Sequence, residues 1–273
     1  MMGGWVIFIF LTLSLLNTEF KTYFKVIGWF TTTVMLFLFS YHALFNQQSI
    51  IQSIIAIISG FYTLFILKLI IIDNINIRQT TIFICISSGI LLLGYTISTI
   101  QFALIYNVAS ETQYFLDLLG YNTELKVSDN GVYIYFIENS LQTEIIMACT
   151  GIGSIALFAG FISSIDTFTI KTKLIYIFIS TSVIYLLNIV RNVFIAGAYG
   201  GQWFHIQPEL IGILFGRTDE WVSFYIADRI IAQFGAVIIM VIFSFMIINM
   251  INDKTKLIQE LKLIIKHTRH MIK

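Results

Sequence analysis

Long apolar runs separated by short polar breaks dominate the chain. Most runs reach the roughly 20 residues that cross a hydrocarbon core about 30 Å thick. The first is as short as a signal-peptide core, but it lacks a basic leader and a small-x-small cleavage site, so we expect it to span too. The runs cover residues 4–16, 26–45, 50–72, 81–106, 145–165, 174–199 and 222–250. The pattern predicts an all-α, polytopic membrane helical bundle of about seven transmembrane helices.

The composition supports a membrane protein. Hydrophobic residues make up 58% of the 273 residues, charged residues make up 11%, and Pro208 is the one proline. Such a chain cannot fold as a soluble domain with a charged surface. We expect a single transmembrane domain over residues 1–250 with an outer cap loop over 107–144, and no nucleic-acid partner. The basic, amphipathic tail over 251–273 should lie along the inner leaflet.

The distribution of basic residues predicts the orientation. If the N-terminus lies outside, twelve of the sixteen Lys and Arg residues fall in cytoplasmic segments or at the cytoplasmic ends of spans. Only Lys126 and Arg217 then fall in outer loops. The positive-inside rule therefore favours an outer N-terminus and a cytoplasmic C-terminus in the cell membrane.

The outer loop contains a hairpin signal. In the segment LKVSDNGVYIYFI, apolar and polar residues alternate on both sides of Asn130-Gly131. This dipeptide is typical of the tight primed turns that join two antiparallel strands. We expect a small β-hairpin in an otherwise helical protein.

Three polar residues on three predicted spans reach a similar depth in the outer leaflet. Cys149 is about five residues from the outer end of its run, Arg191 about eight and Arg229 about seven, at ~1.5 Å per residue. Ionisable residues inside a membrane are costly and are functional candidates by default. Two arginines beside a thiol would favour the thiolate, and they could stabilise an oxyanion during acyl transfer.

Structural roles remain open for each of these residues. A lone cysteine in an apolar helix is often a packing residue, and an arginine can extend its charge to the headgroups. Asp228, Asn188 and Tyr225 lie next to or one turn before the arginines, where they could orient them or simply join helices. Cys85 is expected near the cytoplasmic end of its span, on the opposite side of the membrane from Cys149, so a disulfide between the two is excluded. Two cysteines alone make no metal site, and we expect no cofactor.

Three blocks of the sequence resemble a known family. They are ACTGIGSIALFAG around Cys149, VIYLLNIVRNVFIAGAYGGQWF around Arg191 and VSFYIADRIIAQ around Arg229. Together they look like the signature blocks of the exosortase/archaeosortase family, and they are most similar to its archaeosortase branch. The resemblance runs from about Glu144 to about Phe243, with 42 and 38 residues between the three key positions.

The resemblance implies a membrane-embedded cysteine transpeptidase of the archaeal cell surface. Such enzymes recognise a C-terminal sorting signal, a Pro-Gly-Phe motif followed by a transmembrane helix and a basic tail, on S-layer glycoproteins and other surface proteins. They are thought to pass the new C-terminus to a membrane lipid. Cys149 would be the nucleophile, and Arg191 and Arg229 would stabilise the thiolate or the oxyanion.

The group that moves the proton is not assigned by the resemblance. In exosortases the third member is a histidine, whereas Arg229 cannot release its proton at neutral pH. Either the arginines preform the thiolate while water or Asp228 handles protons, which we favour, or His205 in the outer loop reaches the site.

Two other functions fit parts of the pattern. Buried arginines could bind the anionic substrate of a membrane transporter, although the chain has no matched halves and no proline-broken helices. A lipid acyltransferase without protease activity would use the same nucleophile.

Overall fold

The computed structural model describes residues 2–16, 20–46, 49–72, 77–128, 131–204, 219–250, 259–260 and 262–263. The helices are α1 (Met2–Leu15), α2 (Lys21–Phe45), α3 (Ile50–Ile71), α4 (Arg78–Thr96), α5 (Ser98–Leu118), α6 (Ile152–Ser163), α7 (Ile170–Gly200), α9 (Trp221–Phe224) and α10 (Gln233–Met250). A 3₁₀ turn, η1 (Met147–Thr150), precedes α6, and a π-helix, η2 (Tyr225–Ala232), joins α9 to α10. The predictions for His205, for the turn residue Asn130 and for most of the tail 251–273 lie outside the described residues.

The helices confirm a polytopic, all-α membrane protein. Within the described residues, five helical stretches are long and apolar enough to cross a membrane, namely α2, α3, α4, α7 and the continuous stretch Trp221–Met246. Two shorter apolar helices, Gly4–Leu15 and Ile152–Ser163, accompany them. Most of the predicted runs therefore correspond to apolar helices, with the two differences given below.

The run 81–106 is two helices rather than one. Helix α4 ends at Thr96, Ile97 has an extended backbone (φ −92°, ψ 101°), and α5 begins at Ser98 and continues to Leu118. The Thr96 hydroxyl donates to the Leu92 carbonyl (2.6 Å), a local bond of the kind that competes with regular helix. The first part of the predicted outer loop 107–144, as far as Leu118, is consequently helical.

The run 145–165 begins as a strand and a turn. Gln142–Ile145 forms a strand, Met147–Thr150 forms a 3₁₀ turn, and the helix begins only at Ile152. A short apolar run has the same appearance in a buried strand and in a buried helix, so hydropathy alone placed the helix start too early. Cys149 therefore precedes helix α6 instead of lying inside a span.

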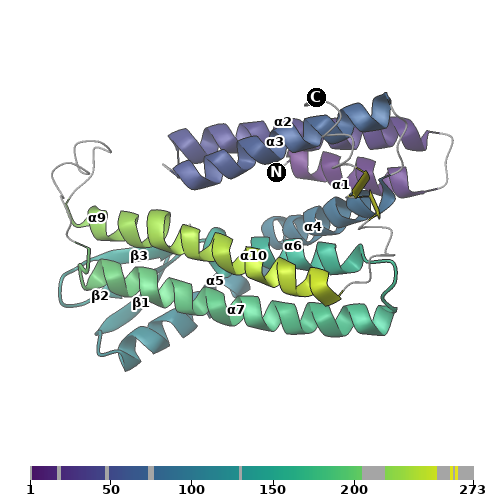
Figure 1. The fold of residues 1–273 in the computed structure, drawn as a ribbon. Coiled ribbons are helices and arrows are strands. Elements are labelled where there is room, and N and C mark those ends of the chain that lie inside the picture. The colour runs from purple at the N-terminus through teal and green to yellow at the C-terminus, as the bar shows by residue number, and fades with distance from the viewer. Residues whose placement is uncertain are drawn as a thin grey trace. The chain divides into compact units, whose positions relative to one another are not determined.

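The chain forms two compact units. The first comprises Met1–Thr96, Gly153–Thr181 and Asn249–Lys273, and the second comprises Ile97–Ile152 and Ser182–Ile248. In the first unit, α2 and α3 lie side by side (Figure 1), joined by hydrogen bonds between Thr33 and Thr63 (3.0 Å) and between Ser40 and Ser53 (2.9 Å). Small hydroxyl residues of this kind hold helices together in lipid, where hydrophobic burial supplies little driving force.

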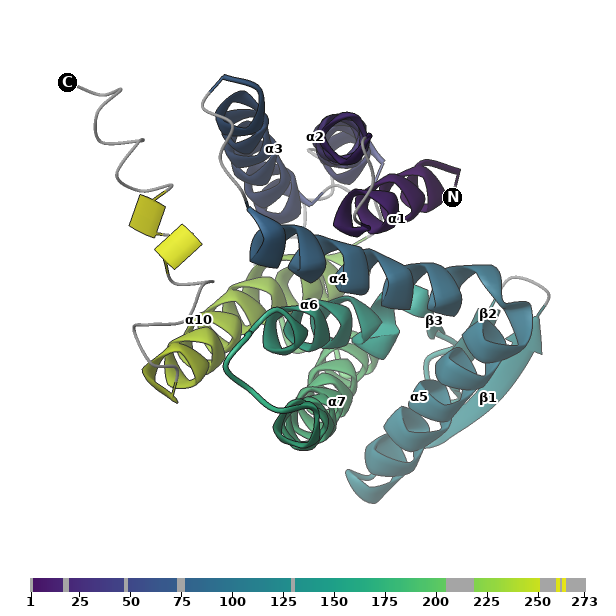
Figure 2. The same ribbon diagram turned by 90° about the vertical axis from the view of Figure 1, so that its right-hand side faces the viewer.

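The second unit combines helices with a three-stranded antiparallel sheet. Strands β1 (Thr123–Ser128), β2 (Gly131–Phe136) and β3 (Gln142–Ile145) lie in the order β1-β2-β3, and α5 packs on one face of the sheet (Figure 2). Ser128 pairs with Gly131, which confirms the predicted hairpin, while β3 was not predicted. The side chains buried between helix and sheet include Val108, Leu116, Val132, Ile134 and Ile145. This packing fixes the strand that leads to Cys149.

Candidate active site

Cys149 lies in a tight turn between a strand and a helix. Its backbone N–H donates to the Ile146 carbonyl (2.8 Å), and the Thr150 hydroxyl donates to the Met147 carbonyl (2.8 Å). The Ile152 N–H in turn donates to the Thr150 hydroxyl (3.4 Å), which caps the start of α6. The cysteine is thus held by a turn whose two ends are set by regular structure.

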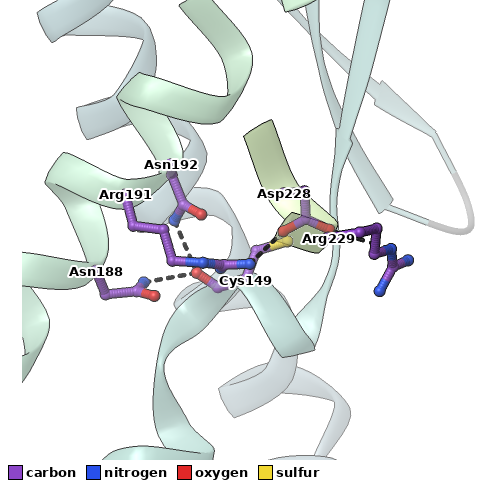
Figure 3. Close-up of polar contacts among 6 residues, drawn as sticks. All are labelled: Cys149, Asn188, Arg191, Asn192, Asp228 and Arg229. Carbon is purple, nitrogen blue, oxygen red and sulfur yellow. Dashed lines mark hydrogen bonds and ion pairs between the residues drawn. The ribbon is translucent and has the colours of Figure 1, made fainter. Parts of the chain in front are cut away.

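Two asparagines on α7 hold the backbone carbonyl of Cys149. The side-chain amides of Asn188 and Asn192 donate to this oxygen at 2.6 and 2.8 Å (Figure 3). The two residues are four positions apart, so they lie one above the other on the same face of the helix. Asn188 was expected to support the site, whereas Asn192 was missed, although the spacing in the segment NIVRN places both beside Arg191.

The residue after the turn allows this close approach. Gly151 has a positive φ of 75°, and a Cβ added there would lie 3.0 Å from Cγ and 3.2 Å from Cβ of Asn188. A side chain at this position would meet both a disfavoured backbone conformation and the asparagine that holds Cys149.

We expect Gly151→Ala to impair both stability and reactivity. The strained backbone should lower the free energy of unfolding by about 1–2 kcal/mol, and displacement of Asn188 should slow any reaction of the Cys149 thiol. Thermal unfolding in detergent and the alkylation rate of Cys149 measure the two effects. Gly153→Ala is the matched control, because an added Cβ at Gly153 meets no atom within 4 Å. Equal behaviour of the two variants would contradict the argument.

The charged residues form one cluster around a shared carboxylate. An oxygen of Asp228 pairs with the guanidinium of Arg191, and the other lies 3.4 Å from Nε of Arg229 (Figure 3). The Asp228 side chain is 11% exposed, against 27% for Arg191 and 21% for Arg229. A partly buried carboxylate with two arginine partners neutralises part of their charge, so Asp228 is central to the site rather than peripheral.

Asp228 and Arg229 belong to the π-helix η2. Sequence patterns give no sign of such a segment, and π turns inside helices are frequent at functional sites. Tyr225, for which both an orienting role and a structural role were open, begins the same segment, and its ring packs on Trp221 with 5.0 Å between centroids. The π-helix therefore supplies two of the three charged residues of the site, Asp228 and Arg229.

The thiol of Cys149 points toward the Arg191–Asp228 pair (Figure 3). Cys149 lies outside the five long apolar helices, and burial raises the pKa of its thiol above the ordinary value. The hydrogen bond to Ile146 and the charge of Arg191 lower this pKa, Asp228 raises it, and Arg229 lowers it. Burial is the largest of these effects, so the net direction of the pKa of Cys149 is upward.

The second cysteine has a different environment. Cys85 is buried in the first unit and lies 3.1 Å from the hydroxyl of Thr12, a contact that needs no chemistry. In the part of the chain that the structure describes, no three His, Cys, Asp or Glu side chains form a group that could hold a metal ion.

Comparisons with known proteins agree with the sequence blocks. A family model described as transmembrane exosortase matches residues 1–227. Archaeosortase A of Haloferax volcanii is 35% identical over 174 residues, which cover 62% of this chain and 57% of that protein. Archaeosortase A of Natronomonas pharaonis is 29% identical over 244 residues, which cover 86% of this chain and 77% of that protein. No solved structure matches the chain.

Proposed function

Because the chain belongs to the transmembrane exosortase family, we propose that it is a membrane-embedded cysteine transpeptidase that cleaves C-terminal sorting signals. One observation carries the proposal: a cysteine whose backbone is clamped by two amides directs its thiol at a carboxylate paired with two arginines. A nucleophile, a proton acceptor and cations for a developing negative charge are the parts that acyl transfer requires.

The proposed topology places the site at the outer leaflet, where a secreted surface protein and a membrane lipid can both reach it. With the N-terminus outside and the C-terminus in the cytoplasm, Cys149 lies near the outer leaflet. A secreted protein can present its stem there while its C-terminal helix stays in the bilayer. A lipid headgroup can reach the same position from the side.

In the first step, the Cys149 thiol gives its proton to Asp228 and attacks the substrate carbonyl. The thiolate takes the place of the carboxylate as the partner of Arg191, so the negative charge moves only a short distance. The Cys149 N–H is bonded to Ile146, so it is not free to stabilise the oxyanion as the N–H of a nucleophile often does. Arg191 and Arg229 take that role.

The first step ends when the C–N bond breaks. The proton held by Asp228 passes to the departing nitrogen, and the C-terminal helix leaves as an amine. The acyl part of the substrate stays on Cys149 as a thioester.

In the second step, a hydroxyl or amine of a membrane lipid attacks the thioester. Asp228 accepts the proton of the lipid nucleophile, the C–S bond breaks, and the proton returns to the Cys149 sulfur. The products are a lipid-linked surface protein and the free thiol. No cofactor takes part in either step.

We further propose the substrate class. It comprises secreted surface proteins, S-layer glycoproteins among them, that end in a Pro-Gly-Phe motif, an apolar helix and a basic tail. The motif is what the resemblance of the three sequence blocks to the archaeosortase branch implies, and the two relatives named archaeosortase A agree with that branch.

Trapping of the thioester tests the proposed function. The full-length enzyme is incubated with a reporter protein that ends in the Pro-Gly-Phe motif, an apolar helix and a basic tail, then quenched in acid and digested for mass spectrometry. We expect an adduct of the reporter stem on Cys149. An adduct of a lipid acyl chain on Cys149 would indicate the acyltransferase instead, and the absence of any adduct would overturn the proposal.

A further inference from the structure

The strand that leads into the candidate site forms an edge of the sheet. The described strands lie in the order β1-β2-β3, so β2 is the one described neighbour of β3. The antiparallel register pairs Ile134 with Thr143 and Val132 with Ile145. An edge strand presents backbone N–H and C=O groups that can pair with another extended chain.

The hydrogen-bond pattern shows which groups face outward. The Phe136 N–H donates to the Leu141 carbonyl (2.8 Å), so the directly opposed residues 136 and 141 form a hydrogen-bonded pair. In an antiparallel ladder such pairs alternate, so Thr143 and Ile145 bond to β2. The N–H and C=O groups of Gln142 and Glu144 therefore point away from β2.

The other side of the sheet confirms this alternation. The Ile137 N–H donates to the Asn122 carbonyl (3.1 Å), which continues the β1-β2 ladder through the odd-numbered residues of β2. The even-numbered residues of β2 are then the ones that bond to β3. The outward direction of Gln142 and Glu144 is thus fixed by both neighbouring ladders.

The outer edge of β3 leads directly into the turn that contains Cys149. Ile146 follows β3 directly and is 43% exposed, and its carbonyl accepts the Cys149 N–H (2.8 Å). The Cys149 carbonyl is in turn clamped by Asn188 and Asn192. A chain lying along β3 would therefore reach the thiol at a fixed distance.

We propose that the outer edge of β3 binds the extended stem of the substrate by strand addition, with the residues before the cleaved bond pairing with Gln142 and Glu144. This inference rests on the proposed function, which makes the substrate a polypeptide that must lie extended at Cys149. Main-chain pairing supplies binding without reading side chains, and alternate side chains of the added strand meet the enzyme. The exposed Ile146 then offers an apolar contact to the residue nearest the cleaved bond.

Two consequences follow for the substrate. The stem before the motif needs an extended backbone rather than a particular sequence, so stems of different surface proteins are accepted. Proline within the stem at a position that must donate to β3 weakens binding, because proline has no N–H.

A proline on the enzyme's edge tests the pairing. Glu144→Pro removes an N–H that points away from β2, so it leaves the ladder of the sheet intact, and proline is tolerated on edge strands in this orientation. We expect KM for the Pro-Gly-Phe reporter to rise by about three- to tenfold, the size of effect that one lost hydrogen bond produces. The rate of Cys149 alkylation by a small reagent should stay unchanged, since the thiol itself is not altered.

Val127→Pro is the matched control on the opposite edge. Val127 is 55% exposed on β1, and its N–H also points away from β2, so the two prolines make equal demands on the sheet. We expect normal KM in this variant. A normal KM in Glu144→Pro, with thioester still formed by the unaltered enzyme, would overturn the edge inference and leave the proposed function standing. Failure of the unaltered enzyme to form the thioester would overturn the function itself.

A crosslink provides a second measurement that does not depend on whether the sheet tolerates a proline. A photoreactive phenylalanine analogue replaces Gln142 in the full chain carrying Cys149→Ala, and the same reporter is added before illumination. We expect a crosslink to the reporter residues that precede Pro-Gly-Phe. A crosslink to the apolar helix, to a second copy of the enzyme or to no protein at all would each contradict strand addition.

Discussion

Replacing Cys149 with alanine is expected to abolish processing of a Pro-Gly-Phe reporter. The side chain is the nucleophile of the proposed reaction, and loss of a nucleophile lowers enzymatic rates by about a thousandfold or more. The measurement is the fraction of reporter converted to the lipid-linked, faster-migrating form in cells that carry the variant. The alanine should be tolerated structurally, because the backbone of the turn is held by main-chain and asparagine hydrogen bonds rather than by the thiol.

The second cysteine supplies the control for this experiment. Cys85→Ala removes a buried thiol of the first unit that contacts Thr12, so it tests for general effects of losing a cysteine. We expect processing close to that of the unaltered protein. Processing that persists in Cys149→Ala would refute the assignment of the nucleophile.

Replacing Asp228 with asparagine should change thiol reactivity and catalysis in opposite directions. The negative charge of Asp228 raises the pKa of Cys149, so its removal lets Arg191 and Arg229 lower this pKa. The alkylation rate of Cys149 should therefore begin to rise at a lower pH in the variant. Reporter processing should fall by about a hundredfold or more, because the proposed proton acceptor is lost.

The combination of alkylation at lower pH and reduced processing distinguishes this role of Asp228 from damage to the fold. A misfolded variant would lose processing and give an alkylation profile unlike that of a single site. Asp117→Asn is the matched control, because Asp117 accepts hydrogen bonds from Thr123 (2.6 and 3.2 Å) away from the cluster, and an amide oxygen can still accept them. An unshifted alkylation profile in Asp228→Asn would contradict the electrostatic account of the thiol.

The fold was predictable where hydropathy decides it. Residues 26–45 and 50–72 form helices within a few residues of the predicted limits, because a long apolar run with at most one charge forms a helix in lipid, where its backbone groups must bond to one another. The hairpin was predictable from the alternation around Asn130-Gly131. The break at Ile97 was not, because Ile97 lies between Thr96 and Ser98, and neither a proline nor a glycine marks the position where the helix ends.

The candidate site divides in the same way. Cys149, Arg191 and Arg229 stand out in the sequence because polar residues in apolar runs demand an explanation. The bridging role of Asp228 and the second amide of Asn192 do not stand out, because they depend on how η2 and α7 face the turn at Cys149. The orientation of one element toward another that is distant in the sequence produces no periodic pattern of residues from which it could be predicted. A π-helix likewise looks like an ordinary apolar segment until its backbone is seen.

The shared carboxylate also determines the charge balance of the reaction. In the proposed mechanism, two guanidinium groups, one carboxylate and a neutral thiol give the resting cluster a single positive charge. When the proton moves from sulfur to Asp228, and later to the leaving amine or back to sulfur, a negative charge only changes its position among the same groups. Until the amine departs, catalysis by this cluster redistributes charge locally, and no step draws an ion from water into a partly buried site.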